Sequence, residues 1–150
     1  MSGFDIFDRA ACKANRWLDD LSGELGWSDR YDAYIALRAV LKALRDALPL
    51  EEVIDLGAQL PMIVRGFYYE GWTGPRGSGP AADPDGYLER VRDDLAEAFL
   101  PADGEVVTRA VFRIMARRVS DGEMVHIAHR LPPSLRRLWP PGAPVGRVSR

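Results

Sequence analysis

This sequence is poor in the residues that build disulfides and metal centres. Among its 150 residues there is one cysteine, Cys12, and there are two histidines, His126 and His129. A single cysteine excludes an internal disulfide, so we expect a cytoplasmic protein. No apolar run approaches the roughly 20 residues that span a bilayer. Residues 1–8 also lack the basic and apolar parts of a leader peptide, so we expect no membrane attachment.

The charge is small overall and unevenly distributed. The net charge is −2, but residues 1–75 hold 8 basic and 12 acidic side chains. From Arg109 to Arg150 there are nine arginines against two acids, Asp121 and Glu123. A basic C-terminal quarter could attract anions. The pI near 5.7 argues against a dedicated nucleic-acid-binding domain, so we expect any such binding to be weak.

The chain is similar to itself at an offset of 71 residues. Such self-similarity indicates a duplicated structural unit. Where identity is lost, the aligned positions stay apolar. The residues that return unchanged include Leu60-Pro61 as Leu131-Pro132, Arg38-Ala39-Val40 as Arg109-Ala110-Val111, Glu52 as Glu123, and Arg65 as Arg136. We therefore predict an all-α protein with two pseudo-symmetric tandem units of about four helices each, packed as one compact domain.

The apolar spacing defines the expected elements. Residues 28–48 form the clearest amphipathic helix, with Ser28 as its N-cap and with Arg38, Lys42 and Arg45 on the polar face. No segment alternates as a strand does. We expect a first helical unit over 1–73, a Gly/Pro-rich connector over 74–86, a second unit over 87–140 and an irregular tail over 141–150.

Two copies of one pattern resemble a known family. Arg38-Ala39-Val40-Leu41 leads to Ala58-Gln59-Leu60-Pro61, and Arg109-Ala110-Val111-Phe112 leads to Gly122-Glu123 and Arg130-Leu131-Pro132. Together with the run from Arg65 to Trp72, these segments are similar to the bacterial domain-of-unknown-function family numbered twenty-two sixty-seven. The resemblance covers about Trp17 to Pro140. It implies an all-helical, internally duplicated bacterial protein and supplies no activity or catalytic residues.

One helix carries a metal-ligating pattern. Glu123, His126 and His129 stand three residues apart, and Glu-x-x-His is a unit of carboxylate di-metal bundles. Such bundles need a second Glu-x-x-His, which a chain with two histidines cannot supply. Ser120 also offers Glu123 a capping-box role. We therefore predict no metal and no other cofactor.

No set of residues suggests catalysis. Cys12 has no histidine near it in sequence, and a nucleophile elbow is missing. The glycines of 74–79 follow no strand and precede no lysine, so they do not form a phosphate-binding loop. We assign no catalytic residue and favour a protein that is not an enzyme.

Two groups of side chains are candidates for binding. Tyr69 and Trp72 belong to an aromatic cluster too dense for one helix face, so they either seal the core between the units or touch a partner or ligand. Arg109, Arg113 and Arg117 recur every four residues and either bind phosphates or pair with carboxylates of the chain.

Residues kept in both copies are expected to be structural. Pro61 and Pro132 each start a helix. Arg38, Arg65, Arg109 and Arg136 are expected to cap carbonyls at helix ends or to pair with Asp32, Asp103, Glu52 or Glu123. The function that we favour is a non-enzymatic binding or adaptor module with a protein partner. The alternatives are an anion or nucleic-acid binder through the second unit, and a small-molecule binder or enzyme with a pocket between the units.

Overall fold

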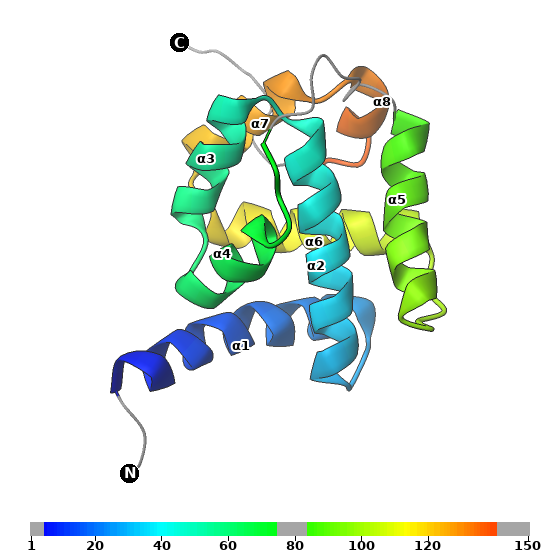
Figure 1. Ribbon diagram of the computed structural model, residues 1–150. Coiled ribbons are helices and arrows are strands. Elements are labelled where there is room, and N and C mark those ends of the chain that lie inside the picture. Colours follow the sequence, from blue (N-terminus) through cyan, green and yellow to red (C-terminus); the bar gives the residue numbers. More distant parts are fainter. Residues whose placement is uncertain (1–4, 75–83, 141–150) are drawn as a thin grey trace.

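The structure, a computed structural model, describes residues 5–74 and 84–140 (Figure 1). These residues form helices and no strand, which confirms the all-α class. The helices are α1 (Asp5–Leu25), α2 (Arg30–Ala47), α3 (Leu50–Gln59), α4 (Met62–Tyr69), α5 (Pro84–Glu97), α6 (Gly104–Arg118), α7 (Asp121–Arg130) and α8 (Pro133–Arg136). Within the described residues, no helix is long and apolar enough to cross a membrane.

Helix α2 lies at the centre of the fold. It contacts α1, α4, α5 and α6, and Figure 1 shows α1 crossing one end of it while α5 runs beside it. Five of its buried residues are alanines, Ala33, Ala36, Ala39, Ala43 and Ala47. Small side chains let neighbouring helices approach closely, so the alanine content of α2 suits its central position. The helices α3 and α7 pack against each other at the opposite end from α1.

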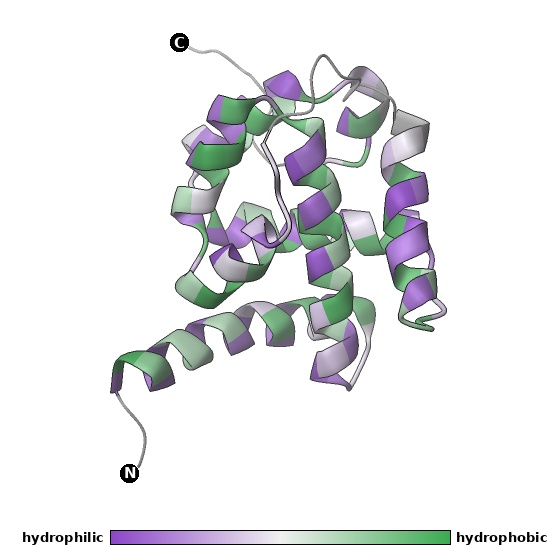
Figure 2. Cartoon of the chain, in the orientation of Figure 1, coloured by the Kyte–Doolittle hydropathy of each residue, from purple (hydrophilic) through white to green (hydrophobic). Residues whose placement is uncertain are grey.

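Hydropathy follows the helical period on the outer helices. Figure 2 shows hydrophilic and hydrophobic residues alternating along α1 and α5, as expected for helices with one face on the core. Arg45 is an exception to the pattern expected for α2. We placed it on the polar face, but it is 7% exposed, and its guanidinium donates to the backbone carbonyls of Tyr68 and Glu70 at 3.0 and 3.1 Å. These bonds satisfy carbonyls at the end of α4, where the helix itself offers no donor.

Among the described residues, side chains cap three of the helices. Asp29, and not Ser28 as expected, caps α2 by accepting a hydrogen bond from the amide of Tyr31. Asp103 caps α6, accepting from the amides of Glu105 and Val106. Ser120 caps α7 by accepting from the amide of Glu123 at 3.2 Å. Aspartate and serine are both strong N-caps, so Asp29 decides where α2 begins.

Two pairs of helices begin 71 residues apart, α3 with α7 and α4 with α8. Moving α3 by 71 positions gives the bounds of α7. The copies also differ, because α4 has 8 residues whereas α8 has 4. Superposition of residues 32–69 on 103–140 stays a prediction.

Parts of the expected domain layout fall on residues that are not described. Residues 75–83 of the expected connector and the expected tail over 141–150 lie outside the described residues. The helix α5 begins at Pro84, within the range expected for the connector. Proline is favoured in the first turn of a helix, where its missing N–H costs no hydrogen bond.

Candidate functional site

A groove separates α1 from the α3–α4 corner. Its volume is about 860 Å³, and the end of α6 closes one side. The α1 residues that line it recur every three or four positions, so they share one helix face. The lining consists of Ile6, Arg9, Ala10, Lys13, Arg16, Trp17, Gln59, Leu60, Pro61, Met62, Arg65, Arg117 and Arg118.

The groove is basic at its walls and apolar at its base. Six of the lining residues are arginine or lysine, and no acidic residue lines it among those described. Trp17 and Leu60 are 3% and 1% exposed and form the base, whereas Ile6 and Met62 are 48% and 54% exposed. Large apolar side chains left in solvent beside cations are typical of a binding surface.

The cations of the groove differ in how far they are neutralised. Arg118 lies 2.7 Å from Asp20, and Arg117 pairs with Glu24. Within residues 5–74 and 84–140, Lys13 and Arg16 pair with no carboxylate. Their charge is therefore available to an anionic ligand.

Arg109, Arg113 and Arg117, which we call the arginine stripe of α6, form ion pairs with carboxylates of the chain. The Nε atom of Arg113 donates to Glu24 at 2.7 Å, and Arg117 pairs with the same carboxylate. These two hydrogen-bonded arginines hold the pKa of Glu24 below its usual value. Arg109 pairs with Glu105 at 3.0 Å. The stripe ties α6 to α1 and leaves little unpaired charge for a phosphate.

Tyr69 and Trp72 lie half-buried at the end of α4. The ring of Tyr69 lies between the rings of Tyr68 and Trp72 and is tilted against both, with centroid distances of 4.8 and 5.6 Å. Its hydroxyl reaches the carbonyl of Val53 at 3.4 Å. A Cβ atom at Gly57 would lie 2.7 Å from the Cζ of Tyr69, so the glycine makes room for this ring. The contacts join α4 to α3.

The repeated arginines that follow each Leu-Pro pair make equivalent hydrogen bonds. Arg65 donates to the carbonyls of Gly57 and Leu60 at 2.8 and 2.7 Å. Arg136 donates to those of Ala128 and Leu131, both at 3.0 Å. Each guanidinium thus caps the carboxyl end of the preceding helix, α3 or α7.

The other repeat-matched residues have local partners. Arg38 donates to the hydroxyl of Tyr34 at 3.2 Å, and its guanidinium lies 5.6 Å from the centroid of that ring. Pro61 and Pro132 stand at the N-caps of α4 and α8. None of the described ion pairs joins Arg38, Arg65, Arg109 or Arg136 to Asp32, Asp103, Glu52 or Glu123.

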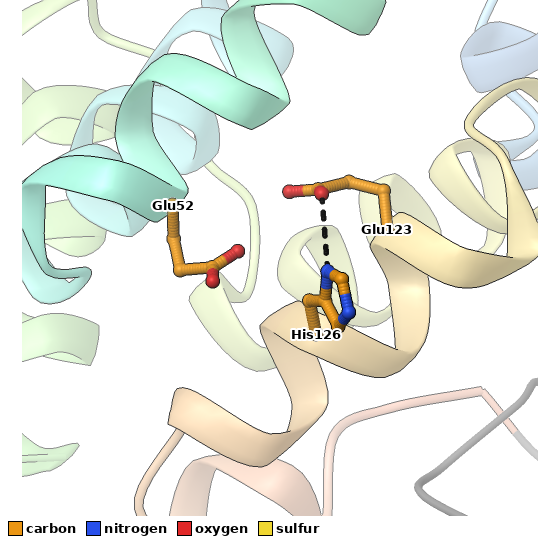
Figure 3. A group of neighbouring side chains, drawn as sticks. All are labelled: Glu52, Glu123 and His126. Carbon is orange, nitrogen blue, oxygen red and sulfur yellow. Dashed lines mark ion pairs between the residues drawn. The ribbon is translucent and has the colours of Figure 1, made fainter.

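A second candidate site lies where α3 meets α7. Glu52, Glu123 and His126 each offer one ligand atom, and these atoms all lie within 4.8 Å of one another. Figure 3 shows the carboxyl groups of Glu52 and Glu123 turned toward each other, with the imidazole of His126 beside them. The adjoining pocket, of about 560 Å³, is lined by Glu51, Glu52, Asp55, His126, His129 and Arg130.

The glutamate pair is buried and incompletely neutralised. Glu52 and Glu123 are 7% and 6% exposed, and among the described residues one oxygen of each, Oε1 and Oε2 respectively, has no hydrogen-bond partner. Burial, followed by repulsion from Glu52 and Asp55, raises the pKa of Glu123 to about 7. His126 Nδ1 and Arg130 Nε each lie 3.9 Å from a carboxylate of the pair.

The capping box expected at Ser120 forms only in half. Its hydroxyl accepts from the amide of Glu123, but its own amide donates to Gln59 Oε1 at 2.9 Å. Glu123 is therefore free of the reciprocal role that we expected for it, and its carboxyl group turns toward α3 instead.

Sequence reasoning missed Glu52 and the α1 wall of the groove. The signal for Glu52 was its alignment with Glu123 at the 71-residue offset, but packing of α3 on α7 could not be read from the sequence. The α1 wall lies partly before Trp17, where the resemblance began. Its signal was the recurrence of Ile6, Lys13 and Arg16 on one helical face.

The fold defines an all-helical protein, in which Arg65 and Arg136 make equivalent caps at the ends of two helices. Over residues 14–144 the chain matches the family described as uncharacterized conserved protein (DUF2267), and it belongs to that family. No curated protein matches the chain.

Proposed function

We propose that this protein is a non-enzymatic binding module whose groove between α1 and α4 holds an acidic, amphipathic segment of a partner protein. The observation that carries the proposal is the composition of the groove. Six cations and no described acid line a cavity whose base is apolar. Such a surface matches a peptide that is acidic on one face and apolar on the other.

The shape of the groove supports a peptide rather than a small anion. Exposed Ile6 and Met62 offer apolar surface that an inorganic anion cannot use. Lys13 and Arg16 stand on α1 between Ile6 and the buried Trp17, so apolar and cationic contacts alternate along the helix. An amphipathic helix presents its own side chains at the same spacing.

A nucleic acid is the weaker candidate. Arg113 and Arg117 are paired with Glu24, and the chain carries a net charge of −2. A duplex would also gain nothing from the exposed apolar residues. Binding in the cytoplasm is part of the proposal, and it is supported by a single cysteine that can form no internal disulfide.

The experiment is a fluorescence-anisotropy titration with a labelled peptide of about five helical turns. The peptide carries Asp and Glu on one face and Leu and Phe on the other. We expect saturable binding that weakens with salt, and about tenfold weaker binding by the double variant Lys13→Glu/Arg16→Glu. The matched control is Arg90→Glu/Arg92→Glu on α5, which changes the net charge equally but lies outside the groove.

Two outcomes would contradict the proposal. One is equal weakening by the groove variant and the α5 variant, which would show a response to net charge alone. The other is that a DNA duplex competes as well as the peptide does, which would assign the groove to polyanions. A peptide with the same apolar face but with Asn and Gln in place of the acids checks the need for charge.

A further inference from the structure

We propose that Glu52, Glu123 and His126 form a binding site for one divalent transition-metal ion, of which Zn²⁺ fits best. The site lies between α3 and α7 and is separate from the α1–α4 groove. The metal-site proposal is independent of the proposed function, because none of Glu52, Glu123 and His126 lines that groove.

Without a cation, the close approach of the two glutamates is costly. Two carboxylates from different helices face each other while both are more than nine-tenths buried (Figure 3). Charges of the same sign held this close in a poorly solvated position cannot both ionise cheaply. A proton shared between them or a bound cation relieves the repulsion.

Two oxygens of the glutamate pair are unsatisfied. Oε1 of Glu52 and Oε2 of Glu123 have no partner among the described residues. The other oxygen of each carboxylate already has a side-chain nitrogen nearby, since Arg130 Nε is 3.9 Å from Oε2 of Glu52 and His126 Nδ1 is 3.9 Å from Oε1 of Glu123. The unsatisfied pair is thus the part of the cluster that an added ion would serve.

The three ligand atoms lie close enough together for one ion to bind them. Tetrahedral Zn²⁺ with bonds of about 2.1 Å holds its ligand atoms roughly 3.4 Å apart. The three atoms lie within 4.8 Å of one another, so movements of about 1 Å bring them to bonding positions. His126 has a side chain that is 64% exposed, and it can make such a movement by changing rotamer.

The donor set favours particular metals. Two carboxylate oxygens and one imidazole nitrogen suit Zn²⁺ and, more weakly, Mn²⁺, whereas Mg²⁺ and Ca²⁺ prefer shells made of oxygen. The adjoining pocket leaves room for a water molecule as fourth ligand. Three protein ligands and one water complete a tetrahedral zinc shell.

The sequence alone led us to predict no metal site, because a di-metal bundle needs two Glu-x-x-His units. A mononuclear site does not. Glu52, the residue that aligns with Glu123, supplies the carboxylate that we sought from a second motif.

The test is calorimetric titration of ZnCl₂ into untagged, EDTA-treated protein in a buffer that does not bind metals. We expect one site per chain. Glu52→Gln, Glu123→Gln and His126→Gln should each weaken binding by at least about tenfold, a loss that even residues merely supporting a metal ligand can cause. The amide substitutions remove the repulsion, so the variants should fold, and a thermal melt without metal verifies this.

Matched controls lie on the same helices. Glu51→Gln changes a carboxylate next to Glu52 whose side chain is 76% exposed, and His129→Gln changes the second histidine of α7. Neither should alter the affinity much. Arg130→Gln should strengthen binding, because it removes a positive charge 3.9 Å from Glu52.

Three results would overturn the site. The first is no heat of Zn²⁺ binding by a protein that is shown to be folded. The second is binding that His129→Gln weakens as much as His126→Gln does, which would indicate adventitious binding by surface histidines. The third is binding that both glutamate variants leave unchanged, in which case the pair is held together by a shared proton.

Discussion

Arg65 and Arg136 lie 71 positions apart and cap two different helices by the same pair of hydrogen bonds. Each guanidinium donates from Nε to the carbonyl eight residues earlier and from one terminal nitrogen to the carbonyl five residues earlier. The four distances lie between 2.7 and 3.0 Å. Since the fork of donors is rigid in arginine, this geometry fixes the angle at each Leu-Pro turn.

Lysine should not replace either arginine. Arg65→Lys and Arg136→Lys keep the charge but cannot reach both carbonyls, so each should lower the free energy of unfolding by about 1–2 kcal/mol. Urea denaturation measures the loss. The control is Arg9→Lys, where a well-exposed arginine makes one contact of 3.8 Å with Asp5. Losses no larger than that of the control would mean that the caps contribute little.

Gly57→Ala should destabilise the protein, although alanine normally favours a helix over glycine. The new methyl group would collide with the ring of Tyr69, and we expect a cost of about 1–3 kcal/mol. In the background of Tyr69→Leu the same substitution should become neutral or stabilising, and a double-mutant cycle measures this coupling. A stabilising effect of Gly57→Ala in the parent protein would place the ring elsewhere.

Glu24→Gln should loosen α1 from α6 and expose cationic charge. The carboxylate of Glu24 accepts from Arg113 at 2.7 Å and also pairs with Arg117, so its loss should cost about 1 kcal/mol.

The parent protein should bind DNA loosely at low salt and should no longer bind it at physiological salt. Gel-shift titration should show tighter low-salt binding by Glu24→Gln and none after charge reversal at Arg113 and Arg117. Tight, sequence-selective binding by the parent would instead favour the hypothesis that the protein is a nucleic-acid binder.

The stability of the metal-free protein should depend on pH through Glu123. Its pKa is raised from 4.5 to about 7, so between these values the folded state holds a proton that the unfolded state has released. Folding is therefore favoured least above pH 7, and stability falls as the pH rises through this window. In EDTA, the melting temperature of Glu123→Gln should increase relative to that of the parent as the pH rises. A constant difference would mean that the carboxyl group titrates normally.

The helices could be predicted from the sequence more readily than the contacts between them. Apolar spacing predicted helical segments that the structure contains, and Ser120 was expected as a cap. The predicted N-cap of α2 was wrong by one residue, because Ser28 and Asp29 are both good cap residues and packing chooses between them. Arg45 was misplaced because burial of an arginine depends on carbonyls that only the folded α4 presents.

The candidate sites depend on contacts between distant segments. The groove joins α1 to residues some fifty positions later, and the glutamate pair joins α3 to α7. Periodicity assigns a residue to a face of its own helix but does not say which helix covers that face. The arginine stripe illustrates the limit: its spacing was visible, whereas its pairing with Glu24 was not.

The most direct measurement of the central claim is a chemical-shift titration of the ¹⁵N-labelled protein with the acidic amphipathic peptide. We predict that the perturbed amides lie along α1 from Ile6 to Trp17 and around Pro61 to Arg65, and that Lys13→Glu/Arg16→Glu needs about tenfold more peptide for the same changes. The amides of α5 and α7 should move little. Perturbations centred on α5 or on Arg136 and Arg137, or none at saturating peptide, would contradict a binding role for the groove.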